Sequence, residues 1–455
     1  MAVVPGEVAV IGLARSGVAV SKLLIRQGER VYASDASSTG ASESAVAELT
    51  ALGAAVDVGR HDVARVANAR YVVTSPGVPP NAPPLAAARA AGKEILSEVE
   101  IALRALPNTR YIAVTGTKGK STTTSLISKL LKSLGLDAED AGNIGTPLSL
   151  LPLREKHPTW VALEISSFQL HDTPSIAPTV GVLTNLAPDH LDRYDGDVNA
   201  YYSDKKLLFR NSTAESARVV NADFPEVRSL VKGTPGTEYG YSVESTADAW
   251  LDKQRDRLML FGEELMPRSQ LPLAGNQNVA NALAAALAVS VADPAHRNED
   301  ARARMRAALT QAAPLPHRFQ PVGEFEGVLW VNDSKATDVL AARVAIENMT
   351  RPTVLLLGGR GKGESYGGLR EAVRAHCKAV IAYGEEGDKI AADLAGASTI
   401  ERLTGDFETV LRRARALARP GDAILLAPAV TSWDMFKDAE ERGSAFAAFA
   451  RAGTV

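Results

Sequence analysis

The chain has 455 residues, of which 45% are hydrophobic and 23% charged, as is typical of a soluble globular protein of about three domains. The formal net charge is only -3, and the arginine-rich stretches 301–309 and 411–420 are spaced as surface helices, so nucleic acid is not an expected partner. The single cysteine, Cys377, excludes an internal disulfide and a multi-cysteine metal site. It fits a reducing compartment, which we expect to be the cytoplasm.

Neither a signal peptide nor a membrane anchor is predicted. Residues 1–17 lack a basic region followed by a long apolar region, and their short apolar run is typical of a first strand. The longest apolar helical run, 281–292, is shorter than the roughly 20 residues that a bilayer requires.

Strands, turns and helices alternate in three consecutive segments, and this pattern predicts parallel α/β layers in each of them. A helix from about Ser16 to Arg26, ended by Gly28, lies in the first segment. The strand-like runs of that segment are 7–13, 29–35 and 69–77. The second segment begins at the run 111–115 and ends in a proline-containing linker at 312–319. The apolar runs of the third segment are 327–334, 352–363, 378–385 and 422–430.

The stretch GTKGKST, residues 116–122, stands between a strand-like run and a helix. Gly116 and Gly119 allow a tight turn whose backbone N–H groups point at phosphate oxygens, and the helix start adds the positive end of its dipole. Lys120 supplies charge for the outer phosphates, and Ser121 supplies a hydroxyl for the Mg²⁺ that bridges them. The motif predicts a nucleoside triphosphate site, although its loop is two residues shorter than the common G-x-x-x-x-G-K-[ST] version.

A weaker motif, GLARSG at 12–17, is followed by Asp35 at the end of the second strand-like run. This spacing imitates a dinucleotide fingerprint. Ala14 replaces the middle glycine and Arg15 stands beside it, so the motif favours a different diphosphate nucleotide over NAD, and a loop that only packs remains an alternative. The turn TSPG, 74–77, either lines the same crevice or is only a turn.

Polar side chains follow the apolar runs of the middle segment, namely Glu164 and the pair Asp189 and His190. Residues at the carboxyl ends of parallel strands face the ligand crevice. Carboxylates suit Mg²⁺, and imidazole is a weaker partner. From the residues alone, Glu164 is equally well a capping residue, His190 a surface histidine, and Lys205 and Lys206 solvated charges.

Eight motifs occur in the order seen in the Mur ligases, and the chain therefore resembles that family from Gly12 to Gly443. These motifs are TGTKGKSTTT, GNIG, LEISSFQL, NLAPDHLDRY, PHRF, NDSKATD, LLLGGRGKG and LLAPAVTSWDMFKDAEERG. The first and the last most closely resemble the branch of the family that joins D-glutamate to UDP-N-acetylmuramoyl-L-alanine.

The resemblance implies an α/β protein of three domains: a Rossmann-like N-terminal domain, a central P-loop ATPase domain and a Rossmann-like C-terminal domain. The implied bounds are 1–98 for binding the UDP substrate, 99–313 for binding ATP and 314–455 for binding D-glutamate. The implied protein is a monomeric cytoplasmic ligase of peptidoglycan precursor synthesis. Its substrates are UDP-N-acetylmuramoyl-L-alanine, D-glutamate and ATP.

The implied reaction activates a carboxylate as an acyl phosphate, and two Mg²⁺ ions and cationic side chains stabilise the charge that develops. Lys205 is implied to be carbamylated, because an ammonium of reference pKa about 10.4 cannot ligate Mg²⁺ whereas a carbamate offers anionic oxygens. The implied catalytic residues are Lys120, His190, Lys205 and Lys335. The implied metal ligands are Ser121, Glu164, His190 and Lys205.

The remaining implied contacts fall into three groups. The ATP contacts are Gly116, Thr117, Lys118, Gly119, Lys120, Ser121, Thr122, Asn278, Arg318 and Asp333. The contacts of the UDP substrate are Arg15, Ser16, Asp35, Gly77, Asn143 and His190. The D-glutamate contacts are Thr337, Lys362, Ser432, Trp433 and Ala439. Without the resemblance, Asn278 would be predicted to cap a helix and Arg318 to pair with an acid.

Three positions depart from the family pattern: Gln277 replaces a common histidine, Arg360 an acid, and Ala439 an aromatic residue. The first bears on the adenine neighbourhood and the last on the shape of the glutamate pocket. Two other functions are alternatives. One is a folylpolyglutamate synthase, whose phosphate loop lies nearer the N-terminus, and the other is an NAD-dependent dehydrogenase or nucleotide-binding regulator built on 12–17. The Asp-Asn-Pro-Arg motif of diaminopimelate-adding relatives does not occur in the chain.

Overall fold

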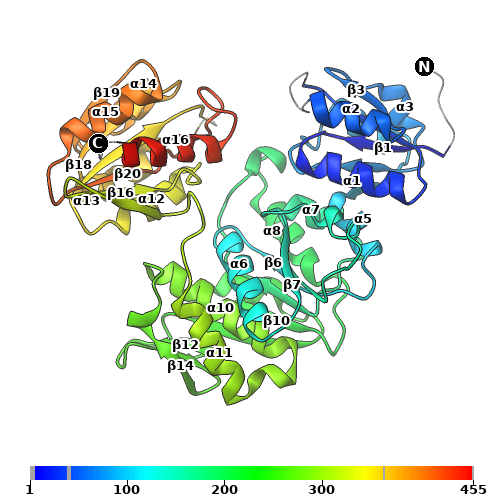
Figure 1. Cartoon of the computed structure of the whole chain (residues 1–455), viewed down its shortest axis with the longest axis horizontal. Helices are drawn as coiled ribbons and strands as arrows, with labels where there is room; N and C mark the ends of the chain where they lie inside the picture. Colours follow the sequence, from blue (N-terminus) through cyan, green and yellow to red (C-terminus); the bar gives the residue numbers. More distant parts are fainter. Residues whose placement is uncertain (1–5, 38–42, 362–363, 453–455) are drawn as a thin grey trace. The chain divides into compact units, whose positions relative to one another are not determined.

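Three β-sheets organise the chain in the computed structural model, which describes residues 6–37, 43–361 and 364–452 (Figure 1). The chain separates into two compact units, Met1–Ala312 with the first two sheets and Ala313–Val455 with the third. The prediction of a three-domain α/β protein is confirmed, whereas the bounds proposed for the individual domains stay predictions.

The first sheet has five parallel strands in the order β3-β2-β1-β4-β5. Along β1, Val8 and Val10 belong to one buried cluster and Ala9 and Ile11 to another, so both faces of the sheet are covered, as parallel sheets require. The strands are β1 Val8–Ile11, β2 Val31–Asp35, β3 Ala55–Val58, β4 Val72–Thr74 and β5 Ile95–Ser97. The helices are α1 Arg15–Arg26, α2 Glu43–Ala51, α3 Val63–Ala67, α4 Pro83–Ala90 and α5 Glu98–Arg104.

The helix predicted at 16–26 is α1, but the strand prediction for this segment was incomplete. The run 69–77, interpreted as a third long strand, contains only the three residues of β4, and the edge strands β3 and β5 were missed. Every residue of β3 is at least partly exposed, so its sequence lacks the continuous apolar run that marks a buried parallel strand.

The second sheet has nine strands in the order β14-β13-β12-β11-β10-β9-β6-β8-β7, parallel from β7 to β12 and antiparallel beyond. The strands are β6 Arg110–Thr115, β7 Ala138–Gly142, β8 Trp160–Glu164, β9 Val180–Leu183, β10 Ala217–Asn221, β11 Thr237–Ser242, β12 Ala249–Asp252, β13 Arg257–Leu260 and β14 Glu263–Pro267. The helices are α6 Lys120–Ser133, α7 Ser167–His171, α8 Val198–Lys206, α9 Pro225–Val231, α10 Asn276–Ala292 and α11 Glu299–Thr310. Short 3-10 helices are η1 Leu148–Leu150, η2 Leu191–Arg193, η3 Leu207–Phe209, η4 Arg268–Gln270 and η5 Pro294–Arg297.

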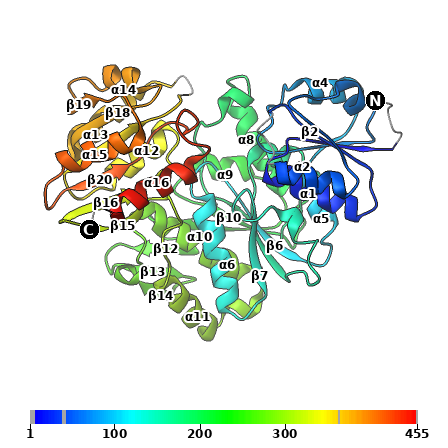
Figure 2. The same ribbon diagram turned by 45° about the horizontal axis from the view of Figure 1, so that its top comes forward.

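Helix α10 is the apolar run of the second segment, and it lies beside α6 (Figure 2). Leu126, Ile127 and Leu130 of α6 share one buried cluster with Val279 and Leu283 of α10. Because α10 is apolar nearly all round, it is buried on most of its surface. This packing fixes the helix that follows the phosphate-loop motif.

The third sheet has six strands in the order β15-β16-β20-β17-β18-β19, of which only the edge strand β15 is antiparallel. The strands are β15 Gln320–Phe325, β16 Val328–Asn332, β17 Thr353–Gly358, β18 Cys377–Tyr383, β19 Thr399–Arg402 and β20 Ala423–Leu426. The helices are α12 Val339–Glu347, α13 Arg370–His376, α14 Gly387–Asp393, α15 Phe407–Leu417, α16 Ala439–Ala452 and the 3-10 helix η6 Tyr366–Leu369. The four predicted runs are β16, β17, β18 and β20, and the edge strands β15 and β19 were missed.

No helix among the described residues is both long enough and apolar enough to cross a membrane.

Glu98 begins α5, at the point where the chain passes from the first sheet to the second, and its side chain is buried. Its Oε1 accepts a hydrogen bond from the Ser149 amide at 2.5 Å, whereas its Oε2 and the Ser149 hydroxyl have no hydrogen-bond partner in the part of the chain that the structure describes. Burial raises the pKa of Glu98 to about 7, although the contacts with Ser149 lower it in part. The protonated carboxyl is therefore the form that the fold favours.

We predict that Glu98→Gln stabilises the protein above pH 7. Because the folded-state pKa exceeds the unfolded value of 4.5, the folded wild type loses stability as pH rises from about 4.5 through about 7, by roughly 2–3 kcal/mol. The uncharged variant avoids this loss. Urea unfolding at pH 5 and pH 8 measures the difference.

Glu100→Gln is the matched control, because that carboxylate accepts hydrogen bonds from Arg104 and from the amide and hydroxyl of Ser175. We expect it to lower stability at both pH values. A Glu98→Gln variant that loses as much stability at pH 8 as Glu100→Gln would contradict the assignment.

Candidate functional site

The loop between β6 and α6 is packed so closely that only glycine fits at positions 116 and 119. Gly116 has φ +142°, and a Cβ there would lie 2.0 Å from Thr184 Oγ1. Gly119 has φ +82°, and a Cβ there would lie 2.4 Å from Asn281 Oδ1. The predicted arrangement of strand, loop and helix is therefore present, with the loop's backbone pressed against β9 and α10.

Two lysines donate to one carbonyl of this loop. Lys120 Nζ lies 3.0 Å from Gly116 O and 2.8 Å from Thr117 O. Lys205 Nζ, from α8, lies 2.8 Å from the same Gly116 O. Carbonyl groups of the loop thus fix the Lys120 side chain. The Gly116 carbonyl also accepts a hydrogen bond from Lys205, which lies 89 residues further along the chain.

Lys205 is almost completely buried, with 1% of its surface exposed. Burial, followed by the nearby charge of Lys120, lowers its pKa well below the ordinary value for lysine. Its Nζ also lies 4.3 Å from the centre of the Tyr201 ring. The neighbouring Lys206 is exposed. The lowered pKa favours the neutral form of the amine, which is its nucleophilic form.

The loop is further tied to the residues after β9. The Lys118 amide donates to Asn185 Oδ1 at 2.9 Å, and Thr184 Oγ1 donates to the Lys118 carbonyl at 2.7 Å. Lys118 Nζ pairs with Asp189 Oδ2 at 3.4 Å. Burial alone would raise the pKa of Asp189, but the charges of Lys118, His190 and Lys120 outweigh it and hold that pKa below its ordinary value.

Glu164 ends β8, next to β6, and is 2% exposed. Its Oε1 accepts a hydrogen bond from Asn143 Nδ2 at 3.0 Å, whereas its Oε2 is buried and has no hydrogen-bond partner among the described residues. An unpaired buried carboxylate oxygen is costly unless a cation completes it. Ser121, at the start of α6, is also buried. This donor set of carboxylate and hydroxyl fits Mg²⁺.

His190 lies in the exposed segment before η2 and has a left-handed backbone, with φ 53°. Its ring meets the edge of Phe168 at a centroid distance of 6.1 Å. Among the residues that the structure describes, no group of three or more His, Cys, Asp or Glu side chains is placed to hold a metal ion.

Asn281 was missed by the sequence analysis, although it belongs to the site. It is 8% exposed, accepts a hydrogen bond from Thr123 Oγ1 at 3.2 Å, and donates to Asn278 Oδ1 at 3.3 Å. Asn278 in turn donates to the Ala274 carbonyl at 2.8 Å. An asparagine inside the apolar run of α10 was the signal that could have found it, because buried polar groups need partners.

The first sheet brings together the loop 12–17, Asp35 and the segment after β4. Asp35 Oδ2 accepts from the Leu13 amide at 2.7 Å and Oδ1 from the Ser37 amide at 2.9 Å. Ser75 Oγ donates to the Gly12 carbonyl at 2.8 Å. A Cβ at Gly17 would lie 1.7 Å from that carbonyl. Arg15 and Ser16 occupy the first turn of α1, and Gly77 lies in the turn after Ser75.

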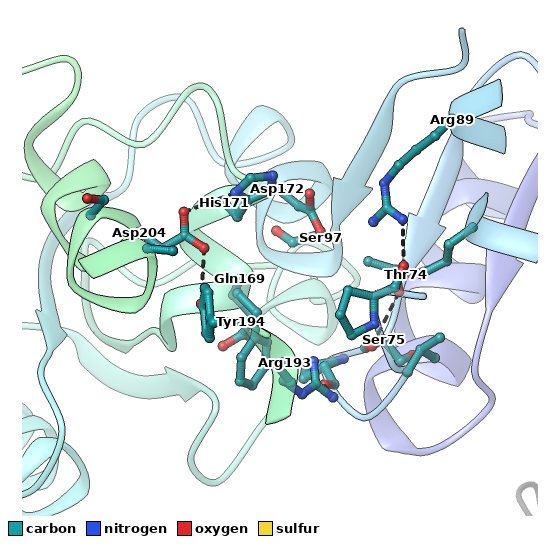
Figure 3. Close-up of a pocket in the computed structure, with 17 residues that line it drawn as sticks. Thr74, Ser75, Arg89, Ser97, Gln169, His171, Asp172, Arg193, Tyr194 and Asp204 are labelled. Atoms are coloured by element: carbon teal, nitrogen blue, oxygen red, sulfur yellow. Dashed lines mark hydrogen bonds and ion pairs between the residues drawn. The ribbon is translucent and has the colours of Figure 1, made fainter. Parts of the chain in front are cut away.

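A cavity of about 410 Å³ lies between the segment after β4 and the elements α7, η2 and α8 (Figure 3). Ser75 and Pro76 line it on one side, and Phe168 and Arg193 line it on the other. Asp172, on the α7 side, has its pKa raised to about 6, because burial outweighs the charges of His171 and Arg89.

The third sheet carries its own cluster of predicted residues. Lys335 Nζ pairs with Glu440 Oε1 at 2.5 Å, and the Thr337 amide donates to the Lys335 carbonyl at 2.9 Å. Asp333 follows β16 directly. Ser432 is buried, whereas Trp433 is 64% exposed. Lys362 lies outside the described residues.

Arg442 is a second residue that the sequence analysis missed. It is 1% exposed, and its guanidinium donates to Ser334 Oγ at 3.0 Å, to the Ser334 carbonyl at 3.0 Å and to the Val430 carbonyl at 3.2 Å. Ser334 Oγ donates to the carbonyl of Ala439, the first residue of α16. Arg442 therefore fixes the segments after β16 and β20 against each other. Arg318 lies in the turn before β15, where its amide donates to the Leu315 carbonyl at 3.1 Å.

Comparison of the sequence with known protein families agrees with this geometry. The family described as Mur ligase MurD-like, N-terminal domain, matches residues 6–97, the Mur ligase middle domain matches 114–289, and the Mur ligase, glutamate ligase domain, matches 317–430. The chain belongs to the Mur ligase family. Like other Mur ligases, it is thus an ATP-dependent ligase, and the resemblance seen in its motifs is confirmed.

Two relatives of this Mur ligase are named UDP-N-acetylmuramoylalanine--D-glutamate ligase. The one from Salinibacter ruber is 36% identical over 450 residues, covering 96% of both chains. The one from Chromobacterium violaceum is 38% identical over 448 residues, covering 97% of this chain and 96% of the relative.

Solved structures share the fold. The UDP-N-acetylmuramate-alanine ligase MurC of Thermotoga maritima aligns with a TM-score of 0.63 and 18% identity over 98% of this chain and 99% of that one. The MurF ligase of the same organism, in complex with ADP, aligns with a TM-score of 0.59 and 19% identity over 86% of this chain and 91% of that one.

We predict that Gly116→Ala lowers the affinity for a non-hydrolysable ATP analogue by about 100-fold, or roughly 2.7 kcal/mol. The added methyl would meet Thr184 Oγ1 at 2.0 Å in a backbone conformation that suits only glycine. Calorimetric titration of the folded variant measures the loss.

Gly135→Ala is the control, because its φ is +83° and, among the described residues beyond its own chain neighbours, no atom lies within 4 Å of the added Cβ. It carries only the backbone strain, about 1 kcal/mol of stability, and should bind the analogue normally. Equal affinities for Gly116→Ala and the wild type would show that the loop does not hold the nucleotide.

Proposed function

We propose that the chain joins D-glutamate to UDP-N-acetylmuramoyl-L-alanine while converting ATP to ADP and phosphate. The names of its near-full-length relatives support the acceptor and the UDP substrate. The observation that carries the chemistry is the pair of lysines on the Gly116 carbonyl, beside a buried carboxylate with a free oxygen. The Lys120 side chain thus lies at the loop where phosphoryl groups would bind.

The reaction follows from the weakness of a carboxylate as an electrophile. The terminal phosphoryl group of ATP passes to the L-alanine carboxylate, giving an acyl phosphate and ADP. The amine of D-glutamate attacks the acyl carbon, and the tetrahedral intermediate expels phosphate and releases a proton as the amide forms. Both steps concentrate negative charge, which Lys120 and the amides of the loop 116–122 are positioned to stabilise.

Ser121 and Glu164 would hold one Mg²⁺, and His190 with a carbamylated Lys205 would hold a second. When bound, Mg²⁺ neutralises phosphate charge and polarises the transferred group. The neutral amine of Lys205 would attack CO₂ and lose a proton, which leaves a carbamate whose two oxygens share one negative charge. The unpaired Glu164 oxygen supports the first assignment, and the depressed pKa of Lys205 supports the carbamate.

The substrates would meet residues of all three sheets. The UDP substrate would contact Arg15, Ser16, Asp35, Gly77, Asn143 and His190. Adenine and ribose would contact Asn278 and Asp333, and the phosphates Arg318. D-Glutamate would contact Thr337, Lys362, Ser432, Trp433 and Ala439, with Lys335 near the reacting groups. Because one chain supplies every proposed contact, we propose that the protein acts as a monomer. The proposed place of action is the cytoplasm.

Phosphate release from ATP tests the proposed function. With UDP-N-acetylmuramoyl-L-alanine present, we expect release with D-glutamate and not with L-glutamate, glycine or diaminopimelate, together with a UDP-linked product heavier by one glutamyl residue. Release with a different amino acid would keep the mechanism and change the acceptor. A folded protein that releases phosphate with none of them would refute the proposal.

Lys120→Ala should reduce ATP turnover by at least about 1,000-fold, while the affinity for the UDP substrate changes less than about threefold. Lys120 belongs to the loop after β6, whereas the proposed UDP contacts are concentrated around the first sheet. Turnover assays and calorimetry on the same preparation separate the two effects. Loss of both in a folded variant would show that the two ligands share a site.

Lys205→Ala should lose most activity and regain part of it with small carboxylates such as formate or acetate, because these can replace the carbamate oxygens. Lys206→Ala is the control, since that side chain is exposed, and it should remain active. Equal loss in both variants, or full activity in Lys205→Ala, would contradict the role given to Lys205.

A further inference from the structure

Arg193 connects two loops that lie on opposite sides of the cavity shown in Figure 3. Its Nη2 donates to the carbonyl of Pro76 at 2.8 Å, across 117 residues of sequence. Pro76 belongs to the segment after β4, and Arg193 ends the 3-10 helix η2, which follows β9. One guanidinium therefore joins the first sheet's loop to the second sheet's loop.

The same guanidinium lies over an aromatic ring. Arg193 Cζ is 4.3 Å from the centre of the Phe168 ring, a cation–π distance. Phe168 meets the His190 ring edge-on, with an interplanar angle of 86°. His190 is the residue immediately before η2 and Arg193 is its last residue, so the two residues at the ends of one short helix both contact the Phe168 ring.

On its other side, the connection continues to the loop 12–17. Ser75 Oγ donates to the Gly12 carbonyl at 2.8 Å, and the Ser75 amide donates to the Ile11 carbonyl at 2.9 Å. Ser75 is 5% exposed. An unbroken series of contacts therefore runs from Gly12 through Ser75, Pro76, Arg193 and Phe168 to His190.

We propose that Arg193 is a positioning residue that couples binding of the UDP substrate to binding of Mg²⁺ and ATP. This inference rests on the proposed function, in which the loop 12–17 meets the UDP substrate and His190 meets the metal. A ligand that orders the loop 12–17 also restricts the position of Pro76. Through the contacts of Arg193 and Phe168, it then restricts the position of His190. By linkage, a nucleotide with Mg²⁺ that fixes His190 then favours the UDP substrate to the same degree.

Arginine suits this position because its planar guanidinium can stack on a ring while donating in its own plane to a carbonyl. Lysine can make the hydrogen bond but not the planar stack. Arg193→Lys should therefore retain part of the coupling that Arg193→Ala loses. A residue with a merely structural role would change stability and leave the coupling unchanged.

The test measures the affinity for UDP-N-acetylmuramoyl-L-alanine by calorimetry, with and without Mg²⁺ and a non-hydrolysable ATP analogue. We expect the nucleotide to tighten binding to the wild type by about tenfold, within the usual range of coupling between sites. In Arg193→Ala and in Phe168→Leu this factor should fall below about twofold, with Arg193→Lys in between. Thermal melts of each variant confirm that it is folded.

Arg89→Ala is the matched control. Arg89 lines the same cavity and donates to the Pro80 carbonyl at 2.5 Å, but it contacts neither Pro76 nor Phe168 in the interactions of the described residues, so its variant should keep the tenfold factor. If the wild type binds both ligands without coupling, this inference is wrong while the proposed function still stands. Full coupling in Arg193→Ala, or an equal loss of coupling in Arg89→Ala, would contradict the inference in the same way. A wild type that binds neither ligand would overturn the proposed function and this inference with it.

Discussion

The carbonyl of Gly116 accepts hydrogen bonds from Lys120 at 3.0 Å and from Lys205 at 2.8 Å, and most of the candidate site follows from that shared contact. Burial lowers the pKa of Lys205 well below its ordinary value, and the nearby charge of Lys120 lowers it further. This lowered pKa supports the carbamate that we propose for Lys205, and the Lys120 side chain lies against the loop that we propose holds phosphate. The glycine itself is required, because a side chain would meet Thr184.

The topology of the parallel sheets places the other side chains of the site near the loop 116–122. Lys120 follows β6, Glu164 is the last residue of β8, and the segment 184–190 follows β9. These three strands are neighbours in the second sheet. The carboxyl ends of adjacent parallel strands meet at one edge of the sheet. Asn281, from α10, accepts a hydrogen bond from Thr123 and lies against Gly119 of the loop. In the same way, Asp35 is the last residue of β2 and Ser75 follows β4. These strands lie on either side of β1, and both residues contact the loop that follows β1.

Much of this was predictable from the sequence, because the phosphate-loop motif and the strong apolar runs report local structure directly. The edge strands β3 and β19 were missed, since partly exposed strands lack such runs. Arg442 and Asn281 were missed because their partners come from distant segments, at 108 and 158 residues of separation. A sequence shows that a polar residue is present, but only the fold shows that it is buried and what it holds.

Oxygen transfer tests the central claim most directly. UDP-N-acetylmuramoyl-L-alanine labelled with ¹⁸O in both carboxylate oxygens would be converted with ATP, Mg²⁺ and D-glutamate, and the phosphate and the product would be weighed by mass spectrometry. If the carboxylate is activated as an acyl phosphate, one ¹⁸O appears in each phosphate released and one remains in the new amide. Phosphate without ¹⁸O, alongside formation of the same product, would contradict the account.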